Sequence, residues 1–125
     1  MPVIFPLAFE IIGLQGIKNA LEGAPHSIRV AANRVADEEV PKIVERAKEI
    51  VPVRTGRLRN SIYWWKTGFL GFEVGATMPY AGFVEFGTRC MRARPYLRPA
   101  MQEKLPEIRE ALKDAIVGQI LEDMK

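Results

Sequence analysis

Two runs of alternating apolar residues in the middle of the chain restrict the folds open to it. Residues 58–66 are rich in Ile, Tyr and Trp, and residues 69–76 place large apolar side chains at every second position. Thr67 and Gly68 form a turn signal between the runs. Apolar residues at every second position are typical of half-buried strands. We therefore predict an antiparallel hairpin, one face of which other elements must cover.

A long helical stripe precedes the hairpin and can supply that cover. Ser27 is the predicted N-cap of this helix, and Pro52 ends it. Its apolar positions recur in steps of three and four and are Ile28, Ala31, Ala32, Val35, Ala36, Val40, Ile43, Val44, Ala47 and Ile50. Pro41 interrupts the stripe, so either the helix kinks there or two helices meet near Glu39.

The two ends of the chain complete the predicted fold. Residues 5–12 are expected to form a first strand, followed by a short helix that Gly23 and Pro25 stop. A C-terminal helix begins near Leu97, with Pro99 in its first turn and Pro106 as a kink or a restart. Its apolar positions are Leu97, Met101, Leu105, Ile108, Leu112, Ile116 and Ile120.

Together these elements predict a single α+β domain over residues 1–125. A small antiparallel sheet, made of the N-terminal strand and the central hairpin, packs against the long helix and the C-terminal helix. The chain has 125 residues and is 48% hydrophobic, which is enough for one core.

Composition argues against membrane, secreted and zinc-dependent proteins. No apolar run approaches the ~20 residues of a membrane span. The apolar N-terminus lacks the basic start and small-residue cleavage site of a signal peptide. The single cysteine cannot form an internal disulfide, and there is no Cys/His cluster for zinc. We expect synthesis in a reducing cytoplasm and no membrane contact.

The sequence offers no catalytic, cofactor-binding or metal-binding constellation. His26 is the only histidine and follows Pro25, so it is expected to be exposed or to cap a helix rather than to join a triad. Cys90 lies among arginines that would lower the pKa of a thiol, but no base is identified for it. We therefore expect a protein without enzymatic activity and without a cofactor.

Positive charge is concentrated in the middle of the chain. Residues 54–98 hold eight bases and two acids, a net charge of +6, whereas the remainder holds ten bases and thirteen acids, a net charge of −3. The eight bases are Arg54, Arg57, Arg59, Lys66, Arg89, Arg92, Arg94 and Arg98. This asymmetry indicates a polyanion or an acidic protein partner, or else a solvated loop surface.

Three consecutive aromatic residues leave two interpretations open. Tyr63, Trp64 and Trp65 lie in the first strand of the hairpin and could form a stacking platform for single-stranded nucleic acid. Alternation instead favours burial of Trp64, with Tyr63 and Trp65 on the other face under a helix or a neighbouring subunit.

Three motifs occur in order along the chain: PVRTGRLRNSI at residues 52–62, YAGFVEFGT at residues 80–88 and ARPYLRPA at residues 93–100. Together they resemble the small tail-component and head–tail joining proteins, also called neck or tail-completion proteins, of long-tailed bacteriophages and prophages. The similarity runs from about residue 7 to the C-terminus. Two departures are the arginine-rich stretch 89–92 with its cysteine and the apolar segment before Phe9.

The resemblance implies a structural virion protein of the neck or tail, without enzymatic activity or cofactor. It would form a ring, possibly a hexamer, around the DNA channel and would contact adjacent neck or tail proteins. The motif residues that would shape the fold are Pro52, Thr55, Gly56, Leu58, Ser61, Tyr80, Glu85, Phe86, Gly87, Pro95 and Leu97.

The residues of these motifs also predict specific local structures. Thr55 and Gly56 suit a tight turn in which glycine takes a positive φ. Tyr80, Phe83 and Phe86 are expected to anchor their segment in the core. A buried Glu85 needs a positive partner, for which Arg57 and Arg94 are the candidates.

Arg89, Arg92 and Arg94 lie in a segment held between Gly87 and Pro95 that lacks apolar periodicity. We interpret it first as an assembly loop, which would pair with acids of a neighbour. Second, it would face the channel and touch DNA phosphates without reading sequence. A catalytic role is the least favoured of the three interpretations.

Overall fold

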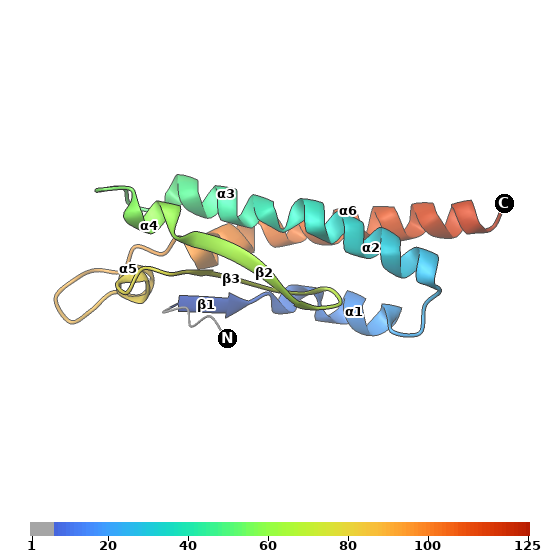
Figure 1. Cartoon of the computed structure of the whole chain (residues 1–125), viewed down its shortest axis with the longest axis horizontal. Coiled ribbons are helices and arrows are strands. Elements are labelled where there is room, and N and C mark those ends of the chain that lie inside the picture. Colours follow the sequence, from blue (N-terminus) through green and yellow to red (C-terminus); the bar gives the residue numbers. More distant parts are fainter. Residues whose placement is uncertain (1–6) are drawn as a thin grey trace.

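The computed structural model describes residues 7–125 and confirms the α+β class. Its sheet has three antiparallel strands in the order β1-β3-β2. The strands are β1 (Leu7–Glu10), β2 (Ile62–Gly68) and β3 (Gly71–Ala76). Helices α2 (His26–Glu39), α3 (Pro41–Ile50) and α6 (Leu97–Asp123) lie along one side of the sheet (Figure 1).

Four shorter helices link these elements. The 3₁₀ helix η1 (Ile12–Leu14) and α1 (Gln15–Leu21) follow β1, α4 (Arg57–Asn60) precedes β2, and α5 (Ala81–Phe86) follows β3. Helices α4 and α5 lie at one end of the molecule, and the C-terminal end of α6 lies at the other (Figure 1). The two ends of the molecule are therefore formed by different elements.

The core lies between the sheet and the helices, as the apolar periodicity predicts. The alternating residues Leu70, Phe72, Val74 and Ala76 are all buried, and they meet the buried stripe of α2 and α3 together with Leu97, Ile108 and Leu112 of α6. The free energy of folding comes chiefly from removing this apolar surface from water.

Prolines have different effects in the two long helical segments. Pro41 is the first residue of α3, where its missing N–H would have no partner in any case. Two helices therefore meet after Glu39, which was one of the two predicted alternatives. Pro106 lies inside α6, which continues to Asp123 without a restart.

Four predicted boundaries are wrong. The first strand ends at Glu10 because η1 follows it, and positions 5 and 6 of that prediction lie outside the described residues. Strand β2 continues to Gly68, so the hairpin turns at Phe69 and Leu70, where Leu70 has a φ of 50°.

The other two corrections concern helix starts. Helix α2 begins at His26 with Pro25 as its N-cap residue. Ser27 therefore does not cap the helix, and its hydroxyl donates to the Asp123 carboxylate of α6. The predicted strand 58–66 begins only at Ile62, because residues 57–60 form α4.

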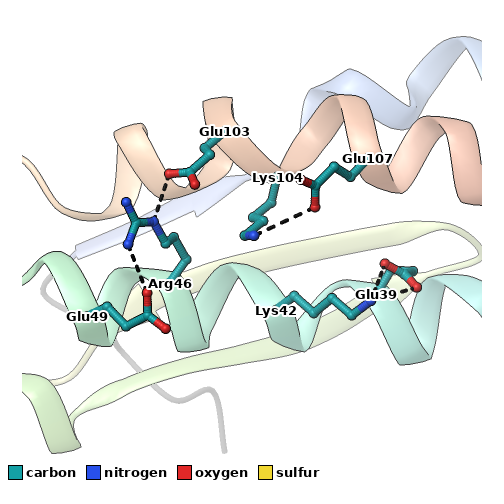
Figure 2. Close-up of polar contacts among 7 residues, drawn as sticks. All are labelled: Glu39, Lys42, Arg46, Glu49, Glu103, Lys104 and Glu107. Atoms are coloured by element: carbon teal, nitrogen blue, oxygen red, sulfur yellow. Dashed lines mark hydrogen bonds and ion pairs between the residues drawn. The ribbon is translucent and has the colours of Figure 1, made fainter.

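One ion pair joins α3 to α6, among several pairs along the two helices (Figure 2). Arg46 lies between the two helices and donates to Glu103 of α6 and to Glu49 of its own helix, both at 2.8 Å. The partners are largely exposed, and exposed pairs contribute at most about 1 kcal/mol each. They orient the helices, whereas the buried apolar residues hold them together.

Candidate functional site

The turn between α3 and α4 has the geometry that its glycine predicts. Gly56 has a φ of 83°, and its carbonyl accepts a hydrogen bond from the Asn60 N–H at 2.9 Å. The Thr55 hydroxyl oxygen accepts a hydrogen bond from the Arg57 N–H at 3.4 Å. Because Gly56 reverses the chain and starts α4, Leu58 is buried on a helix rather than on a strand.

Substitution of Gly56 by valine is therefore expected to lower the free energy of unfolding by more than ~1 kcal/mol, because a β-branched residue is poorly tolerated at positive φ. Thermal or urea unfolding of the variant measures the effect. An unchanged melting midpoint would contradict the assigned strain at this turn.

Glu85 of α5 accepts hydrogen bonds from the first turn of α6. Its side chain is fully buried, and its Oε1 atom accepts from the backbone N–H groups of Tyr96 at 3.1 Å and Leu97 at 2.8 Å. Oε2 lies 3.4 Å from Nε of Arg98. The first N–H groups of a helix have no partner within it and favour a negative charge. Glu85 thus caps α6 from another element.

The prediction that Glu85 pairs with Arg57 or Arg94 is wrong, because the paired arginine is Arg98. Arg98 lies in the first turn of α6, directly beside the N–H groups that bind the same carboxylate. The position of Arg98 shortly after Pro95 in the third motif was the sequence feature that could have identified it as the partner of Glu85. Arg94 is instead held through its backbone, whose N–H donates to the Val84 carbonyl at 2.8 Å.

Tyr96 fixes α5 against the start of α6 from the same side. Its ring is fully buried, and its hydroxyl donates to the Ala81 carbonyl at 3.1 Å. Burial raises the pKa of Tyr96 above its ordinary value, and the Glu85 charge adds to this effect. Glu85 and Tyr96 together make α5 a fixed platform next to residues 87–94.

The prediction that Tyr80, Phe83 and Phe86 anchor this segment in the core is wrong. Phe83 is 59% exposed and Phe86 is 53% exposed, because the buried side of α5 is formed by Ala81 and Glu85. The Phe86 ring lies 5.8 Å from the ring of Phe9. The Arg98 guanidinium lies 4.9 Å from the centre of the Phe86 ring. These aromatic rings therefore contribute to the surface.

Residues 87–94, which we term the arginine loop, form a closed and exposed projection (Figure 1). The Thr88 N–H donates to the Met91 carbonyl at 2.8 Å, and the Thr88 hydroxyl oxygen accepts from the N–H groups of Cys90 and Met91. Gly87 has a φ of 80° and begins the loop. The backbone is thus internally bonded, whereas Arg89 and Arg92 lie in solvent.

A cleft of about 630 Å³ separates the Gly56 turn from the arginine loop. It is lined by residues of the Gly56 turn and α4, of α5 with the preceding Tyr80, and of the arginine loop: Pro52, Arg54, Thr55, Gly56, Arg57, Leu58, Tyr80, Val84, Met91 and Arg94. Its wall is mainly apolar, and Arg54, Arg57 and Arg94 supply its charge. We call it the arginine cleft. It suits an apolar segment that carries negative charge.

Within residues 7–125, six arginines near this end have no acidic partner: Arg54, Arg57, Arg59, Arg89, Arg92 and Arg94. Of the remaining bases in the positive region, Lys66 pairs with Asp37 and Arg98 with Glu85. Unneutralised charges at one end create a positive field that attracts an anionic partner. The arginine cleft and the arginine loop lie within that field.

The aromatic run of β2 follows the predicted alternation. Trp64 is on the core face, with its ring 6.0 Å from that of Phe72, whereas Tyr63 on the other face is 51% exposed. Trp65 also lies on that face and covers the backbone at Gly75. The rings therefore divide between two faces and do not form a continuous stacking platform.

The residues considered for catalysis remain far apart. His26 is exposed at the start of α2, and Cys90 is exposed in the arginine loop at the other end. Within the described part of the chain, no group of three or more His, Cys, Asp or Glu residues could hold a metal ion.

Over residues 7–125, none of the helices combines the length and apolar character that crossing a membrane requires.

Comparison with known proteins gives one match. The model of the family described as "Bacteriophage HK97-gp10, putative tail-component" matches residues 15–87, which is more than half of the chain. This range contains the Gly56 turn, the hairpin and α5. No curated protein matches, and no solved structure matches.

Proposed function

Because the chain belongs to the HK97-gp10-like family of bacteriophage tail components, we propose that it is a non-enzymatic structural protein. It forms or joins a ring at the head–tail junction during tail assembly, with a hexamer as the first candidate for that ring. Membership of a tail-component family places the protein in the virion and implies contacts with other phage proteins. Before assembly it is expected in the cytoplasm of the bacterial host.

The family match carries this proposal, and the surface of the molecule supports it. The buried motif residues, above all Glu85, hold α5 and α6 in a fixed relation. This leaves exposed aromatic rings, an arginine cleft and an arginine loop at one end. Aromatic residues and arginine are enriched in protein interfaces.

Within this role, the arginine loop is proposed to pair with acids of an adjacent subunit or neck protein. Arg89 and Arg92 are exposed, and neither has an acidic partner among residues 7–125. On a ring lumen the same side chains would meet DNA phosphates without sequence preference.

Replacing both Arg89 and Arg92 with serine is expected to leave folding nearly intact, within ~0.5 kcal/mol per site, because both residues are surface residues. The same variant is expected to lose complementation of a phage that lacks this gene, because its virions would lack a functional head–tail junction. Thermal melting and plaque formation measure the two effects.

A control replaces Arg34 with serine, because Arg34 is an exposed basic residue on α2, outside both the arginine end and α6. This control should melt and complement like the parent protein. Full complementation by the Arg89 and Arg92 variant would remove any special role of those two side chains.

The six arginines without acidic partners also favour a second candidate, a small nucleic-acid-binding module. Such a module would bind random DNA as a monomer or dimer, with an affinity that falls steeply as salt rises. A ring component should bind DNA weakly as a free monomer. Sedimentation and a salt titration of DNA binding separate the two functions.

A further inference from the structure

The C-terminal half of α6 carries a second exposed stripe on the side opposite its core-facing residues. Glu110, Asp114, Val117, Leu121 and Met124 follow one another in steps of four and three, and we call them the outer stripe. All five are exposed, with Leu121 at 58% and Met124 at 76%. Steps of four and three place residues on one helical face.

The core does not explain this stripe. The buried side of α6 runs through Ile108 and Leu112 with the half-buried Ile116, and it packs against α2 and α3. Glu110 and Asp114 make no ion pair among the described residues. The outer stripe is thus an apolar surface preceded by two unpaired acids.

The arginine cleft has the complementary chemistry. Pro52, Leu58, Val84 and Met91 give it apolar walls, and Arg54, Arg57 and Arg94 lack acidic partners within residues 7–125. Its volume of about 630 Å³ lies within the range of clefts that bury a ligand. Apolar side chains of one surface and acids beside them would satisfy both features of the cleft.

We propose that the outer stripe of one copy docks on the arginine cleft of a second copy. Leu121 and Met124 would enter the apolar part of the cleft, and Glu110 and Asp114 would meet its arginines. The contact would be the subunit joint of the ring, and in this respect it rests on the proposed function.

The positions of the two surfaces determine the kind of assembly. The cleft lies at the α4 and α5 end, and the outer stripe lies on the part of α6 that reaches the other end (Figure 1). Two different surfaces of one chain make a head-to-tail contact, which closes into a ring or continues as a filament. Such a contact does not require a two-fold axis between the two copies.

Charge favours the cleft over a second outer stripe aligned in parallel as the partner. Two parallel α6 helices would bring Glu110 and Asp114 beside the same acids of the other copy, and like charges in contact are unfavourable. The cleft instead offers three arginines, so the predicted contact joins unlike charges.

A charge-reversal cycle in the full chain tests the contact. One variant carries Arg54→Glu and Arg57→Glu in the cleft, and another carries Glu110→Lys and Asp114→Lys in the outer stripe. Each pair alone is expected to weaken self-association, measured by sedimentation over a concentration series, by about tenfold or more. The combined variant is expected to recover most of the loss, because the attraction is restored with opposite signs.

Two further variants make the result specific. Arg34→Glu reverses an exposed charge on α2, outside both surfaces, and should stay within about threefold of the parent protein. Leu121→Ser removes an apolar contact without changing charge and should weaken association. Thermal melts identify any variant that fails to fold. If a charge-reversal variant does not fold, Leu121→Ser still tests whether the outer stripe takes part in self-association.

Three results would overturn the proposal: a parent protein that stays monomeric up to its solubility limit, association unaffected by the cleft variant, or a combined variant that is no better than the single ones. Loss of association in Leu121→Ser without an effect of the cleft variant would show that the outer stripe binds another surface. The complementation experiment on Arg89 and Arg92 tests the proposed role in the virion separately. The proposed contact between copies and the proposed function can therefore fail independently.

Discussion

Replacing Glu85 with alanine is expected to lower the free energy of unfolding by about 3 kcal/mol or more. The change leaves the N–H groups of Tyr96 and Leu97 without their acceptor at the start of α6. Each of these two buried donors costs about 1–3 kcal/mol when it is left unsatisfied, whereas Arg98 adds little because its side chain is 46% exposed and stays solvated without the carboxylate. Urea unfolding followed by circular dichroism measures the loss.

Glu38→Ala is the matched control, because Glu38 is exposed on α2 and surface substitutions change stability by about 0.5 kcal/mol or less. Glu85→Gln should fall between the two, because it keeps one acceptor oxygen and the side-chain volume but loses the charge. Equal stability of Glu85→Ala and Glu38→Ala would refute the capping role of this carboxylate.

Gly87→Ala is expected to have the second largest effect, a loss of about 2–4 kcal/mol. Gly87 has a φ of 80° and a ψ of 176°, a conformation that essentially only glycine adopts. An added Cβ would also lie 2.7 Å from the Ala93 nitrogen and 2.9 Å from the Met91 oxygen. Both are backbone atoms, so overpacking adds about 1–3 kcal/mol. Thermal unfolding and limited proteolysis of the arginine loop measure the effect.

Gly56→Ala is the comparison in which both causes are weaker. Gly56 has a φ of 83° and a ψ of −3°, in the left-handed helical region, and an added Cβ would find no atom closer than 3.9 Å. Only the moderate strain of that region remains there, so we expect a loss of about 1 kcal/mol. If both alanine variants lost the same stability, neither the glycine-only conformation of Gly87 nor its crowding by the returning backbone of the loop would matter.

The sequence predicted the larger elements because their patterns record burial directly. The alternation of Leu70, Phe72, Val74 and Ala76 is a consequence of a strand with one buried face, and the structure buries all four. Steps of three and four likewise predicted the stripe of α2 and α3. The sequence predicted the ends of the helices and strands less well, because capping and turn residues are compatible with several start and end positions. Leu58, for example, is apolar at a position that fits the end of a strand or a short helix.

The candidate site was predicted in part. The positive φ at Gly56 followed from its place between two elements, and the exposure of Arg89 and Arg92 followed from the lack of apolar periodicity in the arginine loop. The exposure of Phe83 and Phe86 was not predicted, because α5 has only six residues. In so short a helix, the packing of its neighbours decides which side is buried.

The sequence by itself determined the fold class, the helical layer, the hairpin and the positive middle region, because local periodicity and composition depend on neighbouring residues alone. Only the tertiary structure decided that Glu85 caps α6 beside Arg98 rather than pairing with Arg57 or Arg94. It also decided that the Gly56 turn and the arginine loop meet across one cleft. Several arginines of equal chemistry compete for one carboxylate, and packing selects the partner by placing one of them within reach.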